Sequence, residues 1–187
     1  MTVPVLTKDE VTRLLNVPSS RTAVGRRDRA LLSVMALGGL RIAEAVGLKR
    51  DNVHEHDGVT RLTFSGKGDK MRTVTLPQKA ADALRRSLAD HSHPHCFLSA
   101  DHGWPLSVRG GRYVADKCFS AAGLADWVHP HTLRHSCATM LLRATNGDIR
   151  TVQRTLGHAS PETTAKFYDG WNSTDSDRAA AALERFM

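Results

Sequence analysis

The chain lacks the long hydrophobic runs that membrane proteins carry. None of its apolar stretches approaches the roughly 18 residues that a spanning helix needs, and its first ten residues, MTVPVLTKDE, have no apolar centre like that of a signal peptide. We therefore expect a cytoplasmic protein with no membrane partner. Cysteine is also scarce, with three residues, each among apolar neighbours. We predict that Cys96, Cys118 and Cys137 are reduced thiols in or near the core.

Aromatic residues make up 5% of the chain, which is too little for a stacking platform that binds single-stranded nucleic acid. The phosphate-binding pattern GxxxxGK(S/T) is absent, which argues against a P-loop. Histidines alternate at His91, His93 and His95, but no cysteine or carboxylate cluster accompanies them, so we interpret this stretch as a loop. We expect neither a metal nor a cofactor.

Positive charge is what the sequence has in excess. Lysine and arginine number 26 against 19 acidic residues, which gives a net charge of +7 and an isoelectric point near 9.8. Such a basic protein favours a polyanionic partner, and with so few aromatic residues a nucleic-acid duplex fits better than a single strand. At 187 residues the chain is long enough for one domain with a sizeable core.

Hydrophobic periodicity predicts a mainly α fold with a small antiparallel β-hairpin or sheet, an α+β arrangement. A capping box at residues 7–10 opens the first helix, and the second, over residues 21–36, ends at two glycines. Between residues 53 and 77 the period changes to two, which predicts a hairpin closed by residues 65–70. We also predict a helix starting near residue 40 or 41, helices over residues 78–88, 107–121, 132–142 and 148–156, a short strand at residues 96–98, and a helix that begins at Ser160.

The chemistry gathers in residues 129–168, where four polar side chains stand at helix boundaries. His131 and Arg134 lie near the start of one predicted helix. His158 follows the glycine that ends the next helix, and Tyr168 lies about two turns into a third. The guanidinium group of an arginine and the imidazoles of two histidines, placed beside the unpaired N–H groups at helix starts, favour the binding of a phosphate. A tyrosine nearby is able to attack that phosphate, provided that cationic neighbours or a base supply its phenolate.

The order of these residues carries a resemblance to a known family. The runs that carry it are His131-Thr132-Leu133-Arg134-His135, Leu156-Gly157-His158 and Thr163-Thr164 before Tyr168, with Gly39-Leu40-Arg41-Ile42-Ala43-Glu44 and Gly66-Lys67-Gly68-Asp69-Lys70 upstream. Together they resemble the catalytic boxes of the tyrosine recombinases, the phage-integrase and Xer-like family. The resemblance covers residues 5–172 and implies the catalytic-domain fold of that family.

The resemblance also implies an activity, the site-specific cutting and rejoining of double-stranded DNA through a 3′-phosphotyrosyl link. It assigns catalysis to Arg41, Lys67, His131, Arg134, His158 and Tyr168, with Glu44 in support and Lys70 as the register alternative to Lys67. Tyr168 is then the nucleophile, Lys67 the proton donor to the leaving oxygen and His131 the residue that transfers a proton at the tyrosine. The two arginines and His158 hold the charge of the phosphorane, and neither ATP nor a metal is needed. We predict that His135 is structural.

The resemblance and the sequence together also lead to expectations about DNA contacts and assembly. Arg109 and Arg112, on the predicted helix of residues 107–121, are candidates for contacts with the DNA backbone, as is Lys70. Residues 173–187 predict an alanine-rich amphipathic helix that packs on its own domain or on a neighbouring protomer. The family implies tetramers on paired DNA sites. Its members usually carry an N-terminal DNA-clamping domain ahead of the part that matches residues 1–172, and we expect that domain to be absent, as in a fragment or a catalytic-only recombinase.

Two other functions stay open from the sequence. A type IB topoisomerase-like enzyme uses the same tyrosine chemistry but religates the same strand. A DNA-binding regulator keeps the fold without catalysis, although the complete set of six catalytic residues argues against it. Tyr168 is the only candidate nucleophile, because Tyr113 lies outside the boxes.

Overall fold

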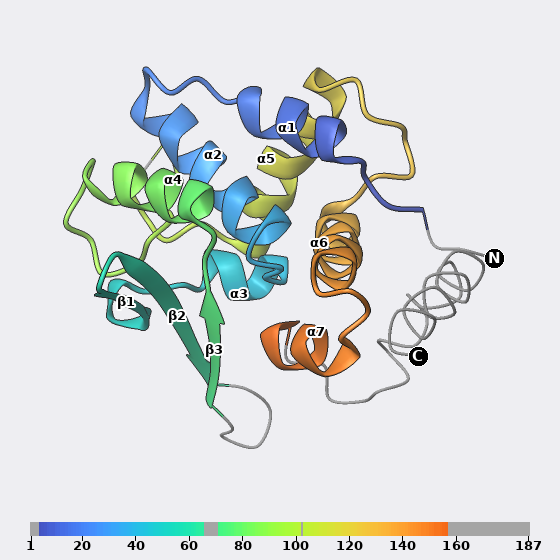
Figure 1. The fold of residues 1–187 in the computed structure, drawn as a ribbon. Coiled ribbons are helices and arrows are strands. Elements are labelled where there is room, and N and C mark those ends of the chain that lie inside the picture. Colours follow the sequence, from blue (N-terminus) through green and yellow to red (C-terminus); the bar gives the residue numbers. More distant parts are fainter. Residues whose placement is uncertain (1–3, 66–70, 102, 157–187) are drawn as a thin grey trace, which may run out of the picture.

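The structure is a computed structural model, and it describes residues 4–65, 71–101 and 103–156 of the chain (Figure 1). Residues 66–70 of the predicted hairpin closure at 65–70, and the predictions for residues 157–187, lie outside these described residues. Within them are Arg41, His131 and Arg134 of the predicted catalytic set.

The described part of the chain is mainly helical and carries a three-stranded antiparallel sheet, which confirms the predicted fold class. Its elements are α1 (Lys8–Asn16), α2 (Ala23–Ala36), α3 (Ile42–Val46), the 3-10 helix η1 (Arg50–Asn52), β1 (Val53–His56), β2 (Val59–Ser65), β3 (Met71–Thr75), α4 (Gln78–Leu88), α5 (Val108–Ala121), α6 (Pro130–Ala144) and α7 (Ile149–Leu156). The sheet projects from the helices, and α7 packs beside β3 (Figure 1).

Side chains that satisfy the first free N–H groups fix where the helices begin. Thr7 accepts from the Glu10 amide at 3.2 Å, while the Glu10 carboxylate accepts from the Thr7 amide at 2.7 Å, which confirms the predicted capping box. Thr22 and Ser107 cap α2 and α5 through amides three residues on. Asp148 caps α7 in the same way. The predicted starts of these helices therefore agree with the structure to within two residues.

The predicted hairpin is the β2–β3 pair, in which Leu62 lies opposite Val74. Both side chains are buried, so one face of the hairpin belongs to the core. Strand β1 was not predicted as a separate element. This strand joins β2 through Asp57 and Gly58, whose φ angles of 50° and 72° are those of a tight two-residue hairpin turn.

One local prediction is wrong and another is shifted. Residues 96–98 form no strand, because the backbone there makes only isolated bridges, and these join Lys49 to His95 and Leu98 to Pro105. The third helix begins at Ile42, one residue beyond the predicted range, because Arg41 has an extended backbone (φ −69°, ψ 151°) and is the N-cap residue.

Helix α2 is the centre of the core. Its half from Ala30 onward is fully buried, and the helix contacts α1, α3, α4, α5 and α6. This half needs no polar face, because other helices surround it. The three cysteines are free and buried, as predicted. After Ala36 the chain turns through Gly38 and Gly39 toward α3. Residues 39–44, which we call the first arginine box, follow this turn, and Leu40 stays in the core while Arg41 is exposed.

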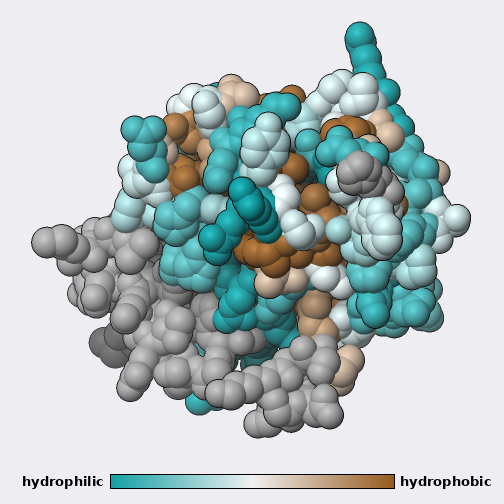
Figure 2. Space-filling model, turned by 180° about the vertical axis from the view of Figure 1, so that it is seen from behind, coloured by the Kyte–Doolittle hydropathy of each residue, from teal (hydrophilic) through white to brown (hydrophobic). Residues whose placement is uncertain are grey.

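The face opposite to that of Figure 1 is mostly hydrophilic, with a patch of hydrophobic residues in its middle (Figure 2). Large apolar side chains that are exposed include Met71, Trp104 and Tyr113. Single exposed apolar side chains of this kind are ordinary on globular proteins. Among the described residues, no helix combines the length and the apolar character needed to cross a membrane.

Gly39 is the position at which packing most constrains the backbone. Its φ is 67°, and a Cβ there would lie 2.3 Å from Leu156 Cδ2 and 3.3 Å from Cys137 Sγ. Only glycine offers both the left-handed φ and the missing side chain. The end of α7 and the middle of α6 therefore rest directly on the backbone that leads into the first arginine box.

We predict that Gly39→Ala lowers the free energy of unfolding by about 2 to 4 kcal/mol, since it adds a clash to the cost of a left-handed alanine. Gly58→Ala is the matched control, because its φ is 72° but no heavy atom lies within 4 Å of the added Cβ. That variant should lose only about 1 kcal/mol. Urea unfolding of both variants measures the difference, and equal losses would show that packing at Gly39 is unimportant.

Candidate active site

Arg41 is the N-cap residue of α3, and its side chain is 47% exposed. The Glu44 carboxylate holds it in two ways. One carboxylate oxygen accepts from the Arg41 backbone amide at 2.7 Å, and the other accepts from Arg41 Nη1 at 3.0 Å. Glu44 thus forms an ion pair with Arg41, in keeping with its predicted supporting role, and the exposed remainder of the guanidinium is available to an anion.

Arg134 lies in the second turn of α6 and is 2% exposed. Its Nη1 donates to the Gly39 carbonyl at 2.5 Å, and its Nη2 donates to the Leu156 carbonyl at 2.6 Å. Burial, followed by the charges of Arg41 and Arg72, lowers the pKa of this guanidinium to about 10. The group is still protonated at neutral pH, so it ties α6 to two other segments as a buried cation.

Arg72, the second residue of β3, is a site residue that the sequence analysis missed. Its side chain is 12% exposed, with Nη1 donating to the Leu156 carbonyl at 2.5 Å and Nη2 to the Glu44 carboxylate at 3.1 Å. The guanidinium also lies 5.2 Å from the centre of the Phe64 ring. A weak signal was present in the sequence, since strand alternation places Arg72 on the same face as the buried Val74.

These hydrogen bonds form one continuous chain, which we call the arginine network, and the backbone between Gly39 and Arg41 joins its two ends. It consists of Gly39, Arg41, Glu44, Arg72, Arg134 and Leu156. The network joins four segments that are distant in sequence: the start of α3, the strand β3, the helix α6 and the last carbonyl of α7. It contains three arginines and one carboxylate, and this excess of positive charge attracts an anion.

The carboxylate of Glu44 is ionised within this network. Burial alone would raise its pKa, but the Arg41 amide and the charge of Arg72 outweigh burial, so the pKa lies below its ordinary value. Burial lowers the pKa of Arg72, and the neighbouring Glu44 opposes that effect. Glu44 is therefore the anion that holds Arg41 and Arg72 in place at neutral pH.

His131 lies in the first turn of α6 and is exposed. Its ring centre is 4.4 Å from that of His135 in an edge-to-face contact, and 6.5 Å from that of His129. Burial, followed by the charge of Arg134, lowers the pKa of His131. A neutral imidazole at neutral pH is able to accept a proton, which suits the predicted transfer at the tyrosine.

Arg109 and Arg112 are exposed on the first half of α5. This helix packs closely against α3 at Gly111, where a Cβ would lie 2.7 Å from Val46 Cγ1. The two arginines are thus carried by a neighbour of the helix that Arg41 caps. Their contacts with DNA stay a prediction.

The other predicted site residues, Lys67, Lys70, His158 and Tyr168, lie outside the described residues, so their roles stay predictions. The sequence nevertheless connects them to the arginine network. Residues 66–70 directly precede β3, which carries Arg72, and His158 follows Leu156 by two residues.

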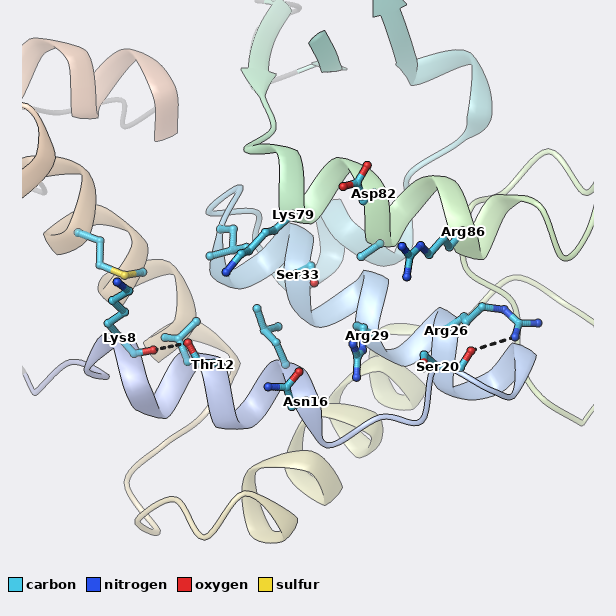
Figure 3. Close-up of a pocket in the computed structure, with 15 residues that line it drawn as sticks. Lys8, Thr12, Asn16, Ser20, Arg26, Arg29, Ser33, Lys79, Asp82 and Arg86 are labelled. Carbon is cyan, nitrogen blue, oxygen red and sulfur yellow. Dashed lines mark hydrogen bonds between the residues drawn. The ribbon is translucent and has the colours of Figure 1, made fainter. Parts of the chain in front are cut away.

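A cavity of about 560 Å³ lies between α1, α2, α4 and α6 (Figure 3). Lys8, Arg29, Lys79 and Arg86 line it together with apolar side chains such as Met140. No residue of the arginine network lines this cavity, so it is distinct from the candidate active site. Within the described residues, no group of three or more His, Cys, Asp or Glu side chains is placed to hold a metal ion.

The histidines of α6 predict a pH dependence of stability. Burial, followed by the charge of His131, lowers the pKa of His135 to about 4 from an ordinary value of 6.5. Between these values the unfolded chain binds a proton that the folded chain does not, so the free energy of unfolding should fall as the pH falls from about 6.5 to about 4. His131 acts in the same direction, because its pKa is also lowered.

Urea unfolding of the wild type and of His135→Gln across this pH range measures the effect. The variant should lose part of the pH dependence, because the depressed imidazole is gone. Identical slopes in the two proteins would contradict the prediction.

Comparisons with known proteins agree with this geometry. A sequence profile of the phage integrase family matches residues 4–173. Tyrosine recombinase XerD of Halalkalibacterium halodurans is 38% identical over 168 residues, which are 85% of this chain and 54% of that protein. Tyrosine recombinase XerD of Corynebacterium glutamicum is 40% identical over 168 residues, with the same coverage. The chain therefore spans about half the length of the relatives that it matches.

Solved structures give the same result. The XerH site-specific recombinase in a post-cleavage complex with its palindromic difH substrate matches 96% of this chain and 53% of its own length, with a TM-score of 0.78 and 27% identity. The XerA recombinase matches 99% of this chain and 66% of its own length, with a TM-score of 0.76 and 28% identity. With its profile match across nearly the whole length and this shared fold, the chain belongs to the phage integrase family.

Proposed function

We propose that this chain cuts and rejoins duplex DNA at specific sites, as a tyrosine recombinase. The observation that carries the proposal is the arginine network, in which three guanidinium groups converge from three elements with only one carboxylate among them. A phosphodiester becomes more negatively charged as it passes to a pentacoordinate state, so fixed cations of this kind favour the transition state over the ground state. The curated relatives are named as tyrosine recombinases, which agrees with this chemistry.

In the proposed reaction the phenolate oxygen of Tyr168 attacks the scissile phosphorus. The new bond is a 3′-phosphotyrosyl ester, and the bond to the 5′ oxygen breaks. Lys67, or Lys70 in the alternative register, gives a proton to that leaving oxygen, which becomes a free 5′-hydroxyl. The ester keeps the energy of the broken bond, so a 5′-hydroxyl is able to reverse the step on a new partner strand without ATP.

The remaining roles follow from position and charge. Arg41 is exposed and fixed by Glu44, so it binds a non-bridging phosphate oxygen directly. Arg134 adds a buried positive charge behind that site, and His158 completes the set of donors. His131 takes the proton from Tyr168 as a neutral imidazole, in keeping with its lowered pKa.

Double-stranded DNA is the proposed partner. The net charge of +7 favours a polyanion, and the XerH structure is named as a complex with its DNA substrate. Arg109 and Arg112 are the proposed backbone contacts of α5. A tetramer on paired DNA sites is the proposed assembly, in which residues 173–187 dock on a neighbouring protomer or on their own domain.

Covalent trapping tests this function. The substrate is a duplex selected from a random pool for binding to the chain, nicked so that a short 5′-hydroxyl fragment diffuses away after cleavage. We expect a protein–DNA adduct that survives denaturation, and its complete loss in Tyr168→Phe, because no other group replaces the nucleophile. Tyr113→Phe is the matched control and should form the adduct as the wild type does.

The outcomes separate the competing functions. Transfer of the trapped strand to a different 5′-hydroxyl partner supports a recombinase, whereas relaxation of supercoils without transfer would indicate a topoisomerase-like enzyme. Tight binding of the selected duplex without any adduct would contradict the proposal and favour a DNA-binding regulator.

A further inference from the structure

Arg72 is a partly buried cation, and the loss of its hydration offsets much of what its interactions contribute to stability. Its side chain is 12% exposed, and it packs on the Phe64 ring, an apolar neighbour that a nonpolar residue would suit as well. Burying a guanidinium sacrifices its hydration, and a buried ion pair is seldom more stabilising than a nonpolar replacement. Its Nε finds no hydrogen-bond partner among the described residues. This imperfect arrangement points to a role other than stability.

The two partners of Arg72 belong to segments that the proposed reaction must bring together. Nη2 donates to the Glu44 carboxylate, which holds both the backbone and the guanidinium of Arg41. Nη1 donates to the Leu156 carbonyl, the same oxygen that accepts from the buried Arg134. Arg72 therefore links the first arginine box to the end of α7 through a single planar group.

Arg72 and the carbonyl that it binds are also close in the sequence to two residues, Lys67 and His158, that the family resemblance assigns to catalysis. It is the second residue after the segment 66–70, which contains Lys67, and the carbonyl that it binds lies two residues before His158. A displacement of about 1 Å at catalytic groups is enough to lower a rate by on the order of 100-fold. We therefore expect an interaction that fixes β3 against α7 and α3 to set the distances between the phosphate-binding groups of the proposed site.

We propose that Arg72 is a positioning residue of the strand-cleavage site, which holds Glu44 and the end of α7 together so that the phosphate-binding groups converge. This inference rests on the proposed function. Arg72 is not a catalytic residue here, because its two terminal nitrogens are engaged by protein oxygens. A guanidinium suits the task, since its fork reaches two acceptors in one plane, whereas a lysine ammonium is a single point of charge.

The test compares Arg72→Met and Arg72→Lys with Arg61→Met, which removes an exposed arginine from the neighbouring strand β2. Single-turnover formation of the covalent adduct gives the cleavage rate, and fluorescence anisotropy on the same duplex gives the dissociation constant. Arg72→Met should cleave about 30- to 300-fold more slowly while its dissociation constant changes less than about threefold. Arg72→Lys should recover only part of the rate, and Arg61→Met should cleave as the wild type does.

A second readout needs no activity. Hydrogen exchange of the free proteins should show faster exchange in α7 for Arg72→Met than for the wild type or Arg61→Met, because Arg72 no longer binds the last carbonyl of that helix. Exchange in α1, which packs on α2 and α5, should be unchanged, and this separates a local release from general unfolding.

The outcomes are distinct from those of the proposed function. A wild-type chain that forms no adduct would contradict the recombinase proposal, and with it the positioning role. Unchanged exchange in α7 would overturn the linkage whether or not the chain is active. Cleavage by Arg72→Met at the wild-type rate would overturn the positioning role, as would a loss of rate explained wholly by weaker DNA binding.

Discussion

One backbone oxygen, the Leu156 carbonyl at the end of α7, accepts hydrogen bonds from both Arg72 and Arg134. The last carbonyls of a helix have no partner within the helix and carry its negative dipole end, so two guanidinium groups stabilise them well. This shared acceptor is where β3, α6 and α7 meet. The C-terminal carbonyl of α7 thus binds Arg72 and Arg134. These two arginines, together with Arg41, form the candidate phosphate site.

The close approach that permits this arrangement begins in the core. Helix α2 is buried over its second half, and it ends at a turn in which Gly39 has a left-handed φ and no room for a side chain. The Gly39 carbonyl accepts from Arg134, and two residues later Arg41 caps α3. The buried half of α2, the turn at Gly39 and the charged residue Arg41 therefore follow one another directly in the sequence.

Local signals in the sequence predicted most of the fold and half of the network. Strong periodicity gave the bounds of α4 without error, and the family resemblance pointed to Arg41 with Glu44 in support, which the structure joins in an ion pair. Arg72 was missed because one of its acceptors is a backbone carbonyl 84 positions away, which leaves no mark on the sequence, and the other, Glu44, lies 28 positions away in a different element. The burial of Arg134 was missed for the same reason, since an arginine in a catalytic box looks like an exposed ligand until its acceptors are known.

A crystal structure of the chain bound to a nicked duplex would show whether the shared carbonyl organises the site when a phosphate is present. We expect the Leu156 carbonyl to stay within hydrogen-bonding distance of both Arg72 and Arg134 while Arg41 contacts the scissile phosphate. A phosphate bound by Arg41 with either of the other guanidinium groups turned away from that carbonyl would contradict the central role of the network.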